Sequence, residues 1–313
     1  MNDFIFSINA VLPLFILTAL GWFLTKIKVW DENFLKTGNS ISFNILIPAM
    51  LFYNIYISDF GAVFNASLLA FTMCMVVAVC AISLIFVPLV IKERPSRGVI
   101  IQALFRGNFA LLGVPLCQSL AGDEGGQVAS VFIAFIIPAF NILATVILSV
   151  YSDNEREPAM IILKKVIKNP LIIACILGMI FNFLKIPLPQ IILKPVKDLK
   201  SIATPFALLV LGGDFKFKSF IGNLKRVLCT GLCRLIVIPT VAVALAALLG
   251  FRGLHIALVI STFATPVAVS STAMTYKMNG DNDLACQLVV FTTVLSAFTI
   301  TLFAFISRTI GIL

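Results

Sequence analysis

The sequence contains few charged side chains. Only 12% of its 313 residues are Asp, Glu, Lys or Arg and 60% are hydrophobic, whereas soluble domains have about 25% charged and about 45–50% apolar residues. A water-soluble fold is therefore excluded. Ten spans of roughly 20 residues each would use about 200 positions and leave only short connections. These proportions predict an all-α polytopic membrane protein without a large domain outside the membrane.

Residue types that enzymes and metal sites need are also scarce. His255 is the one histidine, which excludes an HExxH zinc protease and leaves a serine protease without a partner histidine inside a span. The seven cysteines include no CxxC pair, so neither a disulfide framework nor a thiolate metal site is indicated. The nearest match to an aspartyl GxGD motif, LGGD ending at Asp214, lacks the first glycine and a partner Asp. We expect no enzyme activity, no metal and no cofactor.

The charges that are present lie between the apolar runs. The net charge of +9 does not form the basic patch that binds nucleic acid. Fifteen of the 23 Lys and Arg residues fall in one set of alternate loops and six in the other, so by the positive-inside rule both termini face outward across the cell membrane. The apolar runs predict ten spans, at 4–26, 34–56, 64–91, 98–121, 126–150, 169–184, 191–213, 226–249, 253–276 and 284–307.

The chain divides into two halves of five predicted spans. The longest connection, 151–168, separates a first repeat over 1–150 from a second over 169–313, and its basic residues predict a cytoplasmic linker. Because five is an odd number, the second half enters the membrane in the opposite sense, as in transporters with inverted repeats. Short internal matches agree with this: RGV opens the fourth span where RGL opens the ninth.

The fourth and ninth predicted spans carry residues that interrupt helices. In the fourth, Arg106-Gly107-Asn108 is followed by Gly113-Val114-Pro115, and in the ninth, Thr265-Pro266 is followed by Ser270 and Ser271. Glycine and proline weaken the helical backbone ladder, and backbone groups released inside a membrane must lie in protein or line a polar cavity. Two breaks at matching places predict a central binding site, although prolines that only kink packed helices are a common alternative.

Two arginines lie inside predicted spans. Arg106 and Arg234 are each about 12 Å from their helix end. The acidic residues lie in loops or toward span edges, so neither arginine has an obvious buried carboxylate. A small organic anion is the partner that we expect, because guanidinium matches a carboxylate in a bidentate geometry. The alternatives are that Arg106 snorkels or binds carbonyls freed by the break, and that Arg234 reaches Asp214 or the interface.

Four blocks of the sequence resemble the auxin efflux carrier family, which includes plant PIN-type carriers and bacterial relatives proposed to move malonate or malate. The blocks are NSISFNILIPAMLF (39–52), RGNFALLGVPL (106–116), TPFALLVLGGDF (204–215) and ATPVAVSST (264–272). The resemblance implies ten helices in two inverted repeats, a scaffold domain and a transport domain that work by an elevator-type mechanism, and crossing fourth and ninth helices. It places the crossover at Asn108, Pro115 and Pro266.

These observations predict a secondary transporter of a small organic anion that lies in the lipid bilayer, binds no nucleic acid and is a candidate homodimer. The alternatives are a sodium-coupled symporter of the bile-acid type and a membrane receptor that does not transport. Lys194, Lys197 and Lys200 at the start of the seventh span either rest at headgroups or attract anions. The candidate substrate-binding residues are Arg106, Asn108, Gly113, Pro115, Thr265, Pro266, Ser270 and Ser271, with Asn44 and Arg234 as secondary candidates.

Overall fold

A computed structural model describes residues 2–58, 65–152 and 158–313. This part of the chain is helical throughout, with fourteen α-helices and three π-helices. In chain order these are α1 (Asn2–Lys26), α2 (Glu32–Ile41), η1 (Ser42–Leu46), α3 (Ile47–Tyr56), α4 (Ala66–Val90), α5 (Arg94–Phe105), η2 (Phe109–Gly113), α6 (Val114–Val150), α7 (Ala159–Ile167), α8 (Pro170–Phe183), α9 (Gln190–Asp214), α10 (Phe217–Leu232), η3 (Cys233–Val237), α11 (Ile238–Leu248), α12 (Leu254–Phe263), α13 (Ser270–Lys277) and α14 (Asn282–Thr309).

Several helical segments are suited to a membrane. By length and composition, four of the described segments are long and apolar enough to cross it: Ala66–Val90, Phe109–Val150, Lys218–Leu248 and Asn282–Thr309. The pair Met160–Ile167 and Pro170–Phe183, bent by 53°, makes a fifth if the two helices are counted as one span. An all-helical polytopic protein is thus confirmed. Ten spans in two inverted repeats stay a prediction, because no more than five of the described segments meet this test.

Both predicted interruptions are present. In the fourth predicted span, α5 ends at Phe105 and η2 begins at Phe109. In the ninth, α12 ends at Phe263 and α13 begins at Ser270. A further irregularity lies in α6, where Ala121 and Gly122 leave the helical conformation and Gly122 has a φ of 70°. Glycine accepts this positive φ without a steric penalty, and the bend falls between the predicted fourth and fifth spans.

Each π-helix lies directly before an Ile-Pro or Val-Pro pair, with Pro48 after η1, Pro115 after η2 and Pro239 after η3. Proline lacks an N–H group and its ring clashes with the carbonyl four residues earlier, and the wider π turn accommodates this. The weakened stretch that we predicted in the fourth span runs from Arg106 to Pro115, and its second part does not open. Gly113 is helical, with φ −64° and ψ −46°, and Pro115 lies in the first turn of α6. The break lies earlier, at Arg106 to Asn108.

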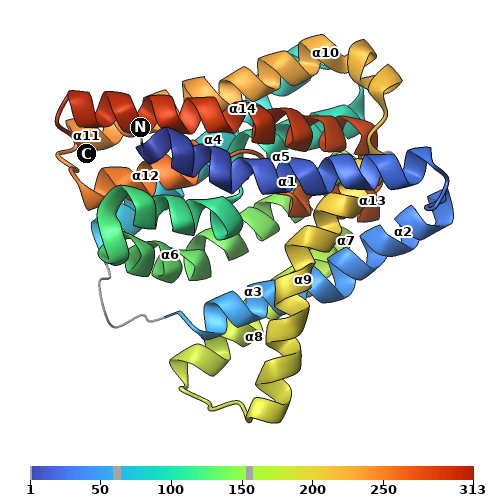
Figure 1. Cartoon of the computed structure of the whole chain (residues 1–313), viewed down its shortest axis with the longest axis horizontal. Coiled ribbons are helices and arrows are strands. Elements are labelled where there is room, and N and C mark those ends of the chain that lie inside the picture. Colours follow the sequence, from blue (N-terminus) through green and yellow to red (C-terminus); the bar gives the residue numbers. More distant parts are fainter. Residues whose placement is uncertain (1, 59–64, 153–157) are drawn as a thin grey trace.

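The core of the molecule lies around α12, which packs against α6, α11 and η2. Every residue of this helix from Ile256 to Phe263 is buried, as expected for a helix that is apolar on all sides. Along another side, α1 packs against both α9 and α14 (Figure 1). A Cβ atom on Gly21 would collide with the Leu209 carbonyl, and one on Gly212 with the Thr18 carbonyl. These glycines therefore allow α1 and α9 to approach closely.

The predicted linker 151–168 contains a helix that we did not expect. Helix α7 occupies its second part and ends at Ile167, just before α8. Residues 153–157 of the linker lie outside the described residues. The division of the chain into repeats on either side of this linker stays a prediction.

Candidate functional site

The two interrupted spans meet each other at their breaks. Gly107 and Val267 form an isolated antiparallel bridge. On one side the backbone N–H of Asn108 donates to the Pro266 carbonyl over 2.8 Å. On the other, the backbone N–H of Ala268 donates to the Arg106 carbonyl over 3.2 Å. Backbone groups freed by one break are thus satisfied by the other, which meets the requirement for irregular backbone inside a membrane.

Arg234, in η3, binds the carbonyl ends of both first half-helices. Its Nη1 donates to the Leu104 carbonyl at the end of α5 over 3.0 Å. Its Nε and Nη2 donate to the Thr265 carbonyl over 3.2 and 3.0 Å, and Nη2 also donates to the Thr262 carbonyl over 3.3 Å. The C-terminal end of a helix carries partial negative charge and unpaired carbonyls, so the fully buried guanidinium neutralises two such ends at once.

This geometry corrects our reading of the two arginines. Binding of the freed carbonyls was the alternative that we considered for Arg106, and the structure gives that role to Arg234. Gly107 makes it possible, because a Cβ atom there would collide with Nη2 of Arg234 and lie 2.7 Å from Oγ1 of Thr265. Among the described residues, Arg234 does not line the small central cavity that lies against Arg106. Asp214, the other partner suggested for Arg234, accepts a hydrogen bond from Asn39 instead.

Arg106 is held by four neutral groups from three helices, α5, α6 and α13. Nη2 donates to Oδ1 of Asn141 over 2.7 Å and to Oγ of Ser270 over 3.1 Å. Nη1 donates to Oε1 of Gln102 over 3.3 Å and contacts Sδ of Met274 at 2.9 Å. The side chain is 3% exposed, and no carboxylate of the described residues pairs with it. Its charge is therefore oriented by its neighbours but left without a counter-ion.

A small cavity lies against Arg106. It has a volume of about 40 Å³ and its lining includes Arg106, Asn108, Asn141 and Ser270. The side chain of Asn108 is 7% exposed, and its Nδ2 finds no hydrogen-bond partner among the described residues. A buried amide without a partner costs free energy. The cavity thus presents a charged donor and a neutral donor that a bound acceptor would satisfy.

The starts of the two second half-helices also face this cavity. Phe109, Ala110 and Leu111 at the start of η2 line it, as do Val269 and Ser270 at the start of α13. In the described structure neither start has a side-chain cap, so amide groups are left available there. Helix N-termini carry partial positive charge and favour anions. At the crossing, Arg234 therefore neutralises the negative helix ends, while the positive ends face the space beside Arg106.

A larger cavity of about 630 Å³ adjoins the small one. The two share Met50, Ala110, Leu111 and Thr204 in their linings, and the larger one extends to Ser58 and Lys200. Lys200 lies over the Tyr53 ring with its Nζ 5.3 Å from the centroid, whereas the exposed Lys194 pairs with Asp198 at 3.9 Å. No acidic residue of the described chain lines either cavity. The larger cavity has the volume of a small-molecule site, and Lys200 gives its lining a positive charge.

The other candidate residues have different surroundings. Pro115 lines the larger cavity, and Thr265 is fully buried beside Arg234. The Oγ of Ser271 donates to the Ala268 carbonyl over 2.5 Å and stabilises the turn at the start of α13. A Cβ atom on Gly113 would lie 2.9 Å from the Ser261 carbonyl, so this glycine allows η2 to pack on α12. Asn44 is exposed, donates to Ser40, and lines a separate hollow.

Sequence reasoning missed Asn141 and Gln102, the two amides that orient Arg106. Asn141 lies in α6 and is fully buried, and Gln102 lies one turn before Arg106 in α5 and also donates to Oγ1 of Thr275 over 2.8 Å. The sequence did offer a signal for both residues, because each is an amide side chain within an apolar run. An unpaired amide is costly to bury in lipid. Such residues are expected to bond to something across a helix interface.

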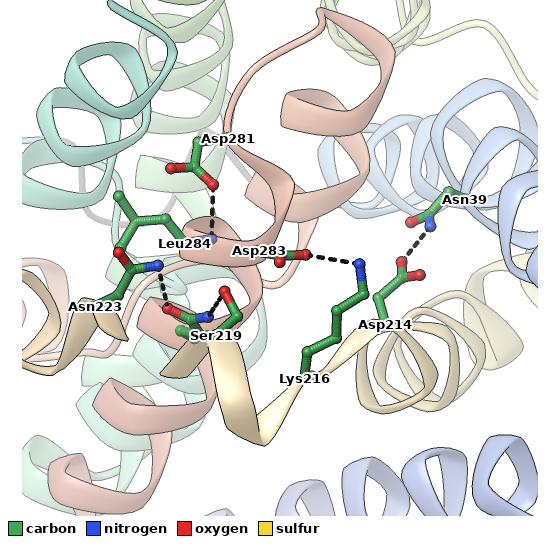
Figure 2. Close-up of polar contacts among 9 residues, drawn as sticks. Asn39, Asp214, Lys216, Ser219, Asn223, Asp281, Asp283 and Leu284 are labelled. Atoms are coloured by element: carbon green, nitrogen blue, oxygen red, sulfur yellow. Dashed lines mark hydrogen bonds and ion pairs between the residues drawn. The ribbon is translucent and has the colours of Figure 1, made fainter. Parts of the chain in front are cut away.

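Asp214 belongs to a polar cluster apart from the crossing. Figure 2 shows its carboxylate facing Asn39, whose Nδ2 donates to Oδ2 over 2.6 Å. Beside it, Lys216 pairs with Asp283 at 3.4 Å. Asn39 comes from α2, Asp214 from the end of α9 and Asp283 from the start of α14, so the cluster joins three helices. The LGGD segment therefore has an ordinary structural role in this arrangement.

The comparisons with known proteins agree with the membrane reading. A family model described as membrane transport protein matches residues 6–304. An uncharacterized transporter of Methanothermobacter thermautotrophicus is 24% identical over 306 residues, which covers 96% of this chain and 98% of the relative. An uncharacterized transporter of Methanocaldococcus jannaschii is 25% identical over 309 residues, which covers 95% of this chain and 98% of the relative.

Proposed function

The chain belongs to the membrane transport protein family, the family of the auxin efflux carriers, and from this premise we propose that it moves a small organic anion by alternating access. The observation that carries the substrate class is Arg106. Its guanidinium is buried against a cavity, held by four neutral groups and left without a carboxylate among the described residues. A charge in the membrane is costly unless it is paired, and a carboxylate in the cavity would pair with it.

The remaining groups around the cavity favour the same substrate. The unpartnered Nδ2 of Asn108 supplies one more donor, and the two uncapped helix starts supply positive dipole ends. The small cavity, at about 40 Å³, accepts a carboxylate-sized group, while the larger cavity holds the rest of the molecule. Lys200 adds positive charge on the way in. A neutral acceptor could bond to Asn108 but would leave the charge of Arg106 without a counter-ion, and a cation would be repelled by it.

The transport motion that we propose is of the elevator type, with ten spans in two inverted repeats. The breaks at residues 106–108 and 264–269 lie in corresponding spans of the proposed halves, which is the expected position of a substrate site in such a carrier. The opposite wall of the small cavity comes from α3 and α9, and its side chains are apolar apart from Thr204. A wall of this kind can slide past the crossing without breaking hydrogen bonds there.

The orientation that we propose places both termini outside, so that the larger cavity opens outward. Cysteine labelling tests this. After the native exposed cysteines Cys74, Cys229 and Cys233 are replaced by serine, Asp123→Cys should react with a membrane-impermeant maleimide in intact cells and Lys92→Cys only after permeabilisation. The reverse pattern would place the termini inside and invert the proposed direction of access.

The proposal is tested by comparing a carboxylate with its amide analogue. Purified protein in liposomes is assayed for uptake of a panel of mono- and dicarboxylates, and binding of the best substrate and its amide is then measured. Arg106→Gln keeps a hydrogen-bonding side chain but removes the charge, so the carboxylate should lose at least about tenfold in affinity, or about 1.4 kcal/mol, while the amide changes little. Arg106→Lys should recover part of the loss, because the planar fork is missing.

Two results would overturn the proposal. If the ratio of the two dissociation constants is the same in wild type and Arg106→Gln, this arginine does not read the substrate's charge. If carboxylates bind to the purified protein but none crosses the membrane under any gradient, including a sodium gradient, the protein is a receptor and does not transport. Arg226→Gln is the matched control, since Arg226 is a surface arginine paired with Glu93 at 2.8 Å and lies away from both cavities.

A further inference from the structure

A second hollow with basic walls lies where α7, α8, η1 and α13 meet. It has a volume of about 290 Å³, enough for roughly ten water molecules at their liquid volume. Its basic lining residues are Lys165 of α7, Lys168 at the junction of α7 and α8, and Lys277 at the end of α13. No acidic side chain of the described residues lines it.

The lysines of this hollow come from distant parts of the sequence. Within the described chain neither Lys168 nor Lys277 forms an ion pair, although they line one hollow. Like charges that converge without an acidic partner repel each other. Pro170, in the first turn of α8, also lines the hollow, so that helix start adds partial positive charge. The ends of α7 and α13 at Lys168 and Lys277 add partial negative charge, which the full charges of the lysines outweigh. The hollow is thus complementary to an anion.

The surface beside the hollow is complementary to lipid. On α7, the side chains of Met160, Ile161, Leu163 and Ile167 are exposed, whereas Lys165 is half-buried and lines the hollow. This short basic and amphipathic helix is bent by 53° from α8, as expected for a helix that lies in the membrane interface. On α8, Ile173, Ile176, Leu177 and Ile180 are exposed as well. Apolar surface for acyl chains therefore continues from the basic hollow.

We propose that this hollow binds the phosphate headgroup of an anionic phospholipid, held by Lys168 and Lys277 with the acyl chains along α7 and α8. Basic pockets between membrane helices are suited to such headgroups. The bound lipid joins the α7–α8 junction to the end of α13. Because Ser270 at the other end of α13 contacts Arg106, the lipid stabilises the helix that forms one side of the central cavity. This site is separate from the central cavity and does not depend on what that cavity carries.

The experiment measures thermal unfolding of the purified protein in a zwitterionic detergent. Phosphatidylglycerol should raise the midpoint by several degrees and phosphatidylcholine should not, since only the former carries a net negative headgroup. Lys168→Gln combined with Lys277→Gln should lose most of this rise. Lys164→Gln is the matched control, because Lys164 is an exposed lysine of the same helix that does not line the hollow, and it should keep the rise.

Two further arms separate a lipid from other anions and from general surface charge. Inorganic phosphate without lipid should give no comparable rise, and an equal rise would show a site for free phosphate and overturn the lipid proposal. An equal loss in Lys164→Gln would show non-specific attraction and would also overturn it. If the double variant folds poorly, each single variant is examined by native mass spectrometry, where fewer bound phosphatidylglycerol molecules than in the control support the site and an unchanged number contradicts it.

Discussion

We expect Arg234 to stabilise the folded protein and to take no part in substrate recognition. Replacing it by methionine keeps an unbranched side chain in the same space but removes every donor. The carbonyls of Leu104, Thr262 and Thr265 then lose their guanidinium partner inside the protein. The Thr262 carbonyl keeps a bond from Oγ1 of Thr265, but the other two are left without this partner. A buried polar group without its partner costs about 1–3 kcal/mol, so two carbonyls amount to roughly 2–6 kcal/mol before any relief.

Part of this cost is recovered, because the variant no longer buries a charge. We therefore expect a net loss near the lower end, about 3 kcal/mol, which is a large share of the 5–15 kcal/mol that is typical of folded proteins. At about 2–4 °C for each kcal/mol, the unfolding midpoint should fall by roughly 6–12 °C. The midpoint of Arg234→Lys should fall by a smaller amount, because the ammonium group keeps the charge and can still bond to one helix end. Some loss remains, because it cannot reach carbonyls on two helix ends as a guanidinium does.

The assay is thermal unfolding in detergent, followed by the carboxylate-to-amide affinity ratio on the folded fraction. Arg226→Met serves as the control on a neighbouring helix, because its ion pair with Glu93 is at the surface and such pairs contribute about 0–1 kcal/mol. If Arg234→Met unfolds at the same temperature as Arg226→Met, the carbonyl contacts do not stabilise the crossing. If it also changes the affinity ratio, Arg234 reads the substrate and the two arginines have the opposite roles.

Two more substitutions examine the crossing itself. Gly107→Ala places a methyl group against Nη2 of Arg234, so it should lower the unfolding midpoint and expression about as much as Arg234→Met; a variant as stable as wild type would mean that the guanidinium does not pack on this residue. Asn108→Ala removes a side-chain donor that has no partner among the described residues, so it should weaken substrate binding by at least about tenfold. The backbone bond from Asn108 to Pro266 stays in place, so the unfolding midpoint should lie within about 2 °C of wild type. Normal binding in this variant would place the site away from the break.

The sequence was sufficient to predict the two interruptions but not the residues at which they open. Glycine and proline indicate where a helical ladder is weak, and both spans do break. In the fourth span, however, Pro115 fits into the first turn of α6 after a π turn, while the opening lies at residues 106–108. Which peptide units open depends on partners in the other span, the Pro266 carbonyl and the Ala268 amide, and no local pattern contains that information.

Helix α7 and the position of Asn44 also could not be predicted from local sequence patterns. A short basic segment such as Lys164-Lys165 is polar enough to be interpreted as a loop, although the residues around it form the helix α7. Asn44 lies in a block that resembles the family, yet its side chain is exposed and lines a hollow other than the small cavity beside Arg106. Membership of a family block identifies a region of the fold and does not show which way a given side chain points.

Arg106 and Arg234 were indistinguishable in sequence because each is an arginine near the middle of a span with no acidic partner. They differ in which end of a broken helix they contact. Arg234 binds carbonyls at the ends of α5 and α12, and Arg106 contacts Ser270 at the start of α13. Since Arg234 bonds to α5 and α12 together, and residues 107 and 267 bridge the two breaks, these half-helices and η3 form one hydrogen-bonded unit. Any motion that exposes the small cavity to the other side must carry this unit as a whole, and Arg106 moves with it because its Ser270 contact lies on α13, just beyond the same crossing.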